Sequence, residues 1–196
     1  MTGQPTNPPV SGHTTATMET SNPLARLDSI STPPKAGILY ALEVPPSGGN
    51  TYFADMYAAY DALSDDLKDR IQDRMAIHDA SRNSAGMLRK GYAEVTDVRE
   101  TPGARHPLVR INPDSGRKAL FLGRRGGSYV LGLAVNESEA LLDRLWAHAG
   151  DARFAMCHEC RVGDLLIWNN PSVLHRRDPF DPDSRRVMHR TQIKGD

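Results

Sequence analysis

The chain has 196 residues, of which 39% are hydrophobic and 24% charged, as in a soluble folded domain with a single core. Basic and acidic residues number 24 each, so the overall charge favours neither nucleic acid nor an anionic membrane as a partner. No apolar stretch is long enough to span a membrane, and the N-terminus lacks the basic and apolar regions of a secretory signal. Two cysteines are too few for a disulfide framework, so we expect a cytoplasmic protein.

The first 23 residues differ in composition from the rest of the chain. They are rich in Thr, Pro, Ser and Gly and contain almost no large apolar side chain. Such a segment cannot bury enough surface to offset the entropy lost on ordering. We therefore expect residues 1–23 to be disordered or loosely attached, and residues 24–196 to form one folded domain.

Residues 36–71 carry the first clear secondary-structure pattern. Residues 36–44 form a short apolar run closed by prolines and glycines, which predicts a buried strand that ends in a turn. Residues 51–54 predict a second strand, and Asp55 is placed to cap a following helix. A further helix is expected after Ser64, because acidic residues stand in its first turn and basic residues follow.

The middle of the chain combines an irregular segment with a hairpin. Residues 80–105 show no clean period, which predicts a long loop; a lid or binding loop and a disordered insertion both remain open. Residues 106–123 read as strand, turn and strand, with turn residues at 112–116. Asn136, with Glu139 three positions later, predicts the start of a helix that Gly150 ends.

The C-terminal third consists mostly of short strands. Residues 154–162 and 165–170 predict two strands, and His175 follows in a polar strand or loop. In the last segment, Arg186, Met188, Arg190 and Gln192 share one face of a strand because side chains alternate. Short strands, Gly/Pro turns and a few helices together predict a β-rich α+β domain, with a double-sheet jelly roll as its core and helices packed outside.

The C-terminal motif GDLLIWNNPSVLHRRDPFDPDSRRVMHRTQIKGD, residues 163–196, resembles the signature of the taurine/2,4-dichlorophenoxyacetate (TauD/TfdA) dioxygenases. The resemblance implies that His175 is the distal ligand of a 2-His-1-carboxylate iron site. It implies that Arg186 binds the far carboxylate of 2-oxoglutarate, and that Arg190 faces an anionic group of the substrate. The chemistry agrees, because imidazole suits Fe(II) and a planar guanidinium grips a carboxylate bidentately. Taken alone, a surface histidine and solvated arginines would be the ordinary interpretation.

Two further blocks extend the resemblance. Residues 33–71 are similar to the family, and Thr51 matches the threonine that hydrogen-bonds 2-oxoglutarate; a strand residue after a turn is the alternative. Residues 106–123 form the third block. The resemblance implies a double-stranded β-helix of the clavaminate-synthase-like kind, with flanking helices and without its N-terminal strands. It implies Fe(II) and 2-oxoglutarate as cofactors, hydroxylation of a small carboxylate or sulfonate substrate, and release of succinate and CO2.

The chain departs from the family at the other two iron ligands, an H-x-D pair that precedes the first block. Counting back from Thr51, these positions hold Leu24 and Arg26, and no H-x-D occurs anywhere in the sequence. A two-residue deletion would bring Asp28 to the carboxylate position, yet the histidine position would then hold Arg26. Neither leucine nor a guanidinium offers a lone pair to a metal, so we expect weak or lost iron binding.

Three hypotheses follow from this departure. The chain is an N-terminally incomplete dioxygenase, or it is an inactive homologue that binds 2-oxoglutarate, another small anion or a partner subunit. Missing N-terminal strands would also expose sheet edges, so a homo-oligomer is possible.

The C-x-x-C pair Cys157 and Cys160 is a weak zinc or redox signal, and we expect plain strand residues pointing to opposite faces.

Overall fold

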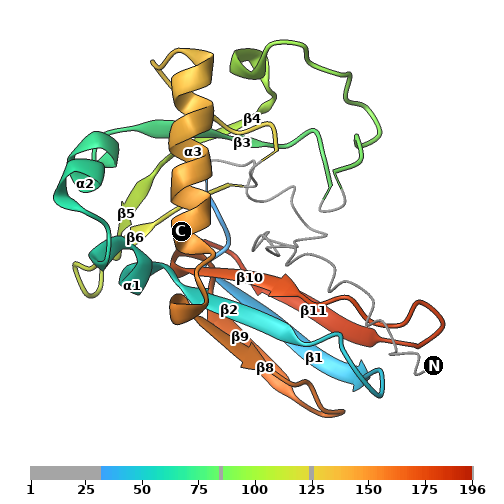
Figure 1. The fold of residues 1–196 in the computed structure, drawn as a ribbon. Coiled ribbons are helices and arrows are strands. Elements are labelled where there is room, and N and C mark those ends of the chain that lie inside the picture. The colour runs from blue at the N-terminus through green and yellow to red at the C-terminus, as the bar shows by residue number, and fades with distance from the viewer. Residues whose placement is uncertain (1–31, 84–85, 124–125, 196) are drawn as a thin grey trace, which may run out of the picture.

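The structure, a computed structural model, describes residues 32–83, 86–123 and 126–195 (Figure 1). The predicted segment 1–23 and the positions Leu24, Arg26 and Asp28 lie outside the described residues. Within the described ranges the chain is strand-rich with a few helices, which confirms the β-rich α+β prediction. None of the helices in those ranges is both long and apolar enough to cross a membrane.

Two antiparallel three-stranded sheets form one end of the molecule (Figure 1). In the first sheet, β1 lies between β11 and β9, and in the second, β2 lies between β10 and β8. The bounds are β1 Ala36–Glu43, β2 Thr51–Asp55, β8 Ala155–His158, β9 Leu165–Asn169, β10 Val173–Arg177 and β11 Val187–Ile193. The sheets face each other, because the rings of Phe53 on β2 and Trp168 on β9 are only 5.5 Å apart, centroid to centroid.

A second group of strands lies beside the two sheets. β3 pairs with β4 and β7, while β5 and β6 form the hairpin predicted within residues 106–123. Their bounds are β3 Met75–Asp79, β4 Gly103–Pro107, β5 Val109–Ile111, β6 Lys118–Leu120 and β7 Tyr129–Val130. Residues 80–102 contain only an isolated bridge and one turn of 3-10 helix in their described part, so the loop ends three residues earlier than predicted.

Three helices, α1 Met56–Asp61, α2 Asp65–Ile71 and α3 Val135–Ala149, complete the fold. The Asp55 carboxylate caps α1 as predicted, since it accepts hydrogen bonds from the backbone N–H groups of Tyr57 and Ala58 at 2.8 and 3.2 Å. The predicted cap of α3 at Asn136 is wrong. The N-cap is Ala134, whose backbone N–H donates to the Glu137 carboxylate at 3.3 Å, so an earlier glutamate fixes the start.

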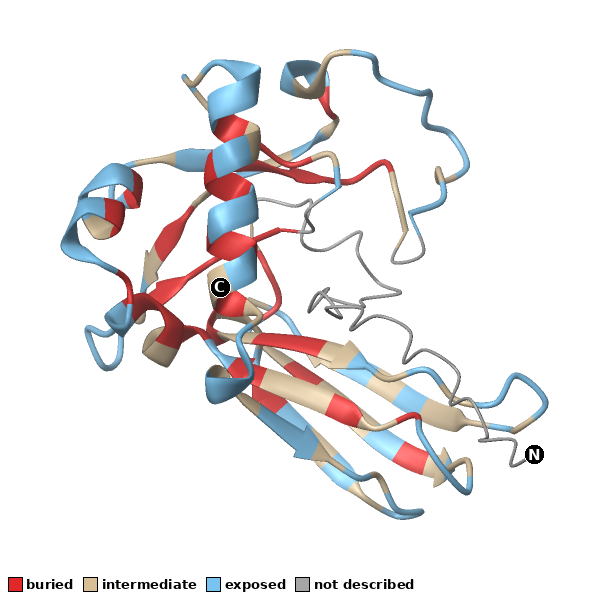
Figure 2. Ribbon diagram, viewed as in Figure 1, coloured by how far each residue is buried: buried red, intermediate tan, exposed pale blue. Residues whose placement is uncertain are grey.

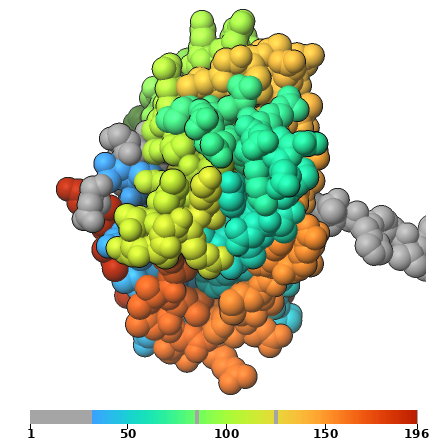
Figure 3. All heavy atoms as spheres, turned by 90° about the vertical axis from the view of Figure 1, so that its left-hand side faces the viewer, coloured from blue at the N-terminus to red at the C-terminus, as the bar shows by residue number. Residues whose placement is uncertain are grey.

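The hydrophobic core lies between the helices and the strands (Figure 2). Leu145 and Trp146 of α3 pack with Ala54 of β2 and Leu174 of β10, on the outer face of the second sheet. On the side shown in Figure 3, the α1–α2 segment adjoins the β5–β6 hairpin, where the Asn112 amide donates to the Tyr57 hydroxyl at 2.6 Å. The core therefore holds β2 and β10 from behind and leaves their other face for the neighbouring sheet.

The first sheet has a distinctive outer face. The predicted alternation of β11 is confirmed, because His189, Thr191 and Ile193 are exposed while Arg190 and Gln192 lie on the inner face. On β9, at the other edge of this sheet, Leu165 and Ile167 remain 57% and 63% exposed. This face therefore combines polar and apolar side chains, and a homo-oligomer stays a prediction.

Gly37 makes room for Trp168 between the sheets. It pairs with Trp168 on one side and with Gln192 on the other. A Cβ atom on Gly37 would lie 2.3 Å from Cζ2 and 2.5 Å from Cε2 of the indole. The absence of a side chain at this position therefore lets the ring lie flat across β1.

We predict that Gly37→Ala lowers the free energy of unfolding by about 1–3 kcal/mol, because the added methyl group must displace a packed indole. The measurement is the urea midpoint followed by circular dichroism. Gly126→Ala is the matched control, since nothing lies within 4 Å of its Cβ position. Equal midpoints for the two variants would contradict the packing described here.

Candidate active site

His175 lies on the inner face of β10, between the two sheets. It is 8% exposed, and β10 places it opposite Phe53 of β2. The centre of its ring is 4.8 Å from that of Trp168 and 6.4 Å from that of Phe53. Two aromatic rings therefore fix the imidazole in a largely water-excluded position.

Arg186 and Thr51 come together although 135 residues separate them. Arg186 lies just before β11, and its Nε donates to the Gly49 carbonyl at 3.1 Å. Its Nη2 donates to the Thr51 hydroxyl at 3.4 Å. Only 3% of Thr51 is exposed. Loss of hydration through burial lowers the pKa of Arg186, yet a guanidinium remains charged at physiological pH.

Cys160 belongs to the same cluster, which the sequence did not indicate. Its Sγ is 3.6 Å from the Thr51 hydroxyl oxygen, and it interacts electrostatically with the Arg186 guanidinium. The prediction that both cysteines are strand residues is wrong for Cys160, because β8 ends at His158. Cys157 does lie in β8 and is exposed. We call the cluster of Arg186, Thr51 and Cys160 the guanidinium site.

A tight turn positions Cys160. The Asp164 carboxylate accepts from the backbone N–H of Arg161 at 2.8 Å and pairs with Nε2 of His158, also at 2.8 Å. The hydrogen bond from Arg161, and then the one with His158, lower the pKa of Asp164. Gly163 has a φ of +93°, which few other residues adopt. The turn from β8 to β9 is thereby closed, and Cys160 is held against Thr51.

Arg190 lies on the inner face of β11, beside Trp168. The centre of its guanidinium group is 5.7 Å from the centre of the indole ring. The same indole contacts His175, so Trp168 connects the two residues. The expectation that Arg186 and Arg190 share a strand face needs correction, because β11 begins only at Val187. The two guanidinium groups therefore occupy separate surroundings, one at Thr51 and the other at Trp168.

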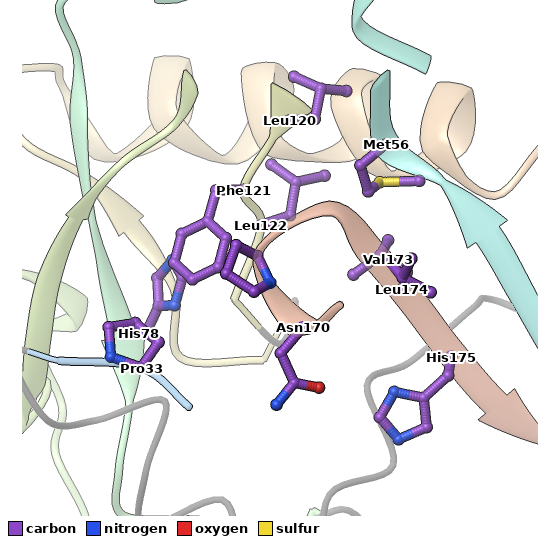
Figure 4. A pocket seen from close by; sticks show the side chains of 11 residues that line it. Pro33, Met56, His78, Leu120, Phe121, Leu122, Asn170, Val173, Leu174 and His175 are labelled. Carbon is purple, nitrogen blue, oxygen red and sulfur yellow. The ribbon is translucent and has the colours of Figure 1, made fainter. Parts of the chain in front are cut away.

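A small cavity of about 30 Å³ lies next to His175 (Figure 4). His78 lies on its far side against Phe121, and Asn170 lies between the two histidines. Within the described residues neither ring nitrogen of His78 has a hydrogen-bond partner. Burial, and then the neighbouring His106, lower the pKa of His78 to about 3, so this ring is neutral. No sequence pattern points to His78, because its cavity is formed only by the folded chain.

The donor set of the described residues does not fit a complete iron site. Among the described residues no three His, Cys, Asp or Glu side chains lie close enough together to hold a metal ion. The two remaining ligand positions expected from the family hold Leu24 and Arg26, whose side chains cannot coordinate Fe(II). Among the described residues His175 is the one predicted metal ligand, and this role stays a prediction.

Comparison with known proteins identifies the family of this chain. The family model "Taurine catabolism dioxygenase TauD, TfdA family" matches residues 6–192. The alpha-ketoglutarate-dependent 2,4-dichlorophenoxyacetate dioxygenase of Cupriavidus pinatubonensis is 40% identical over 178 residues, which cover 90% of this chain and 61% of that protein. Pentalenolactone F synthase of Streptomyces arenae is 33% identical over 79% of this chain and 55% of its own length.

Solved structures show the same relationship. The crystal structure of AAD-2 in complex with Mn(II) and N-oxalylglycine has a TM-score of 0.75 and 32% identity, covering 92% of this chain and 69% of its own. A taurine dioxygenase from Burkholderia xenovorans has a TM-score of 0.74 and 27% identity, covering 95% and 60%. The chain spans about three fifths of the length of the curated relatives it matches. On these matches, and as its C-terminal motif predicts, the chain belongs to the TauD/TfdA family of 2-oxoglutarate-dependent dioxygenases.

Proposed function

We propose that this chain provides the 2-oxoglutarate- and substrate-binding half of an Fe(II)/2-oxoglutarate-dependent dioxygenase that hydroxylates a small anionic substrate, with release of succinate and CO2. The observation that carries the proposal is the guanidinium site, where Arg186 and Thr51 meet. The names of its relatives support it, since they include an alpha-ketoglutarate-dependent dioxygenase of a phenoxyacetate. The two facing sheets would then be the described part of a double-stranded β-helix.

Arg186 and Thr51 would bind the far carboxylate of 2-oxoglutarate. A guanidinium presents parallel N–H donors that match a carboxylate, and the threonine hydroxyl adds another donor. Because Arg186 is half buried, its charge is poorly screened, and a carboxylate would restore the interactions it loses with water. The Gly49 carbonyl orients the guanidinium by accepting from its Nε.

Arg190 would bind the anionic group of the substrate, a carboxylate or a sulfonate. It lies over Trp168, so the charged group and an aromatic wall are adjacent. His175 would be a metal ligand, since its buried imidazole contacts the same indole ring. Leu24 and Arg26 would not complete the coordination of this metal.

A second candidate function is binding without turnover. In this case the chain is an inactive homologue that holds 2-oxoglutarate or another small anion, and the observation that favours it is the replacement of H-x-D by Leu24 and Arg26. The two candidate functions differ in whether the chain releases succinate from 2-oxoglutarate. Release of succinate from 2-oxoglutarate in the presence of Fe(II) and a small carboxylate or sulfonate would support the dioxygenase, and binding of 2-oxoglutarate without succinate would support the second candidate.

We predict that Arg186→Ala weakens 2-oxoglutarate binding about 100-fold, because two charge-assisted hydrogen bonds are lost. Isothermal titration calorimetry measures the affinity. Arg185→Ala is the matched control: this neighbour points outward, and its guanidinium pairs with the Glu43 carboxylate at 2.7 Å. A loss of equal size in both variants would contradict a specific role for Arg186.

We predict that 2-oxoglutarate slows alkylation of Cys160 by iodoacetamide, because the carboxylate would occupy the guanidinium site that its thiol lines. Cys157, exposed on β8, is the internal control and should react at the same rate with or without 2-oxoglutarate. Peptide mass spectrometry over time measures both rates in one sample. An unchanged rate at Cys160 under saturating 2-oxoglutarate would place the carboxylate elsewhere.

We predict weak binding of Fe(II), because one imidazole offers too few ligands for high affinity. Anaerobic titration followed by equilibrium dialysis measures it, with His175→Ala as the comparison. Tight binding of one Fe(II) per chain that His175→Ala abolishes would refute the loss of the iron site.

A further inference from the structure

The inner face of β11 and β9 carries two buried polar groups without partners. Within the described residues, the indole N–H of Trp168 and both polar atoms of the Gln192 carboxamide have no hydrogen-bond partner, and solvent does not reach these atoms. Only 7% of Trp168 is exposed. Buried polar groups are nearly always paired in folded proteins, so three unpaired atoms on one face require an explanation.

These groups lie close together because of Gly37. In the first sheet, Gln192, Gly37 and Trp168 form one row across β11, β1 and β9. Indole Cε2, which is bonded to the N–H nitrogen, would be 2.5 Å from a Cβ on Gly37, so this end of the ring lies over β1. Gln192 stands on the adjacent strand, one strand spacing away on the same face.

The two groups also adjoin the residues proposed to bind substrate. Gln192 is two residues from Arg190 on the same face of β11, a separation of about 6.6 Å along a strand. The Arg190 guanidinium lies over Trp168, and Trp168 contacts His175. A small molecule whose anionic group meets Arg190 can therefore reach Gln192 and the indole N–H as well.

From this arrangement we propose that Gln192 and Trp168 form a subsite for a hydroxyl group, so that the preferred substrate is a small hydroxy acid. A hydroxyl offers one donor and two lone pairs. It can accept from the indole N–H and from the Gln192 amide, and donate to the Gln192 carbonyl, which satisfies all three orphaned atoms. The proposal rests on the proposed role of Arg190 as the anion-binding residue.

Paired acids that differ by one hydroxyl test the subsite: mandelate against phenylacetate, and lactate against propionate. Affinities are measured by isothermal titration calorimetry on the full chain with 2-oxoglutarate present. We expect the wild-type protein to bind one enantiomer of the hydroxy acid at least about tenfold more tightly than its partner acid. Gln192→Leu should reduce this ratio to about one, and Trp168→Phe, which keeps an aromatic ring but loses the N–H, should reduce it in part.

Thr191→Val is the matched control, because Thr191 lies on the exposed face of the same strand, and it should keep the ratio. An ordered water at Gln192 would instead give equal affinities for the paired acids in the wild-type protein. If Arg190→Met still weakens binding of both acids, equal affinities overturn the hydroxyl subsite but not the role of Arg190. Binding that Arg190→Met leaves unchanged, or no binding of any of the four acids, overturns the anion-binding role of Arg190 and the subsite with it.

Discussion

The contact of Trp168 with Gly37 determines how the rest of the site is arranged. With no side chain on β1 at this point, the indole ring lies between the two sheets and contacts Phe53, His175 and the Arg190 guanidinium. An aromatic ring buries a large apolar area and has few rotamers, so it positions its neighbours at low entropic cost. Residues from β2, β9, β10 and β11 are thus held around a single side chain.

The two charged groups of the site are stabilised differently. Arg186 is held by hydrogen bonds to Gly49 and Thr51, which fix the direction of its donors. Arg190 lies near an aromatic face, which favours a cation without fixing a hydrogen-bond direction. Directional donors suit an invariant carboxylate, while an aromatic neighbour tolerates anions of different shape. This difference agrees with the names of two relatives, which share alpha-ketoglutarate but differ in the second compound, a phenoxyacetate in one and a phenoxypropionate in the other.

Much of the fold followed from local patterns in the sequence. The structure confirms the strands at residues 36–44 and 51–54, the Asp55 cap and the alternation of β11. These features follow from the spacing of apolar residues and from turn residues nearby. Roles for His175, Arg186 and Thr51 came from resemblance alone. Cys160, His78 and Gln192 escaped prediction, since each matters through contacts between segments far apart in the chain. The Ala134 cap was missed because alanine has no capping side chain.

The two parts of the site also differ in how far apart their residues lie in the sequence. Trp168 and His175 are seven positions apart, joined by a short turn that contains Pro171, so their contact forms from local chain. Arg186 and Thr51 are separated by 135 residues, and such a contact exists only once the whole domain has folded. A carboxylate that needs both residues binds the native state and not the unfolded chain. Its concentration would therefore set part of the stability of the domain, so the abundance of the folded protein would follow the supply of its own ligand.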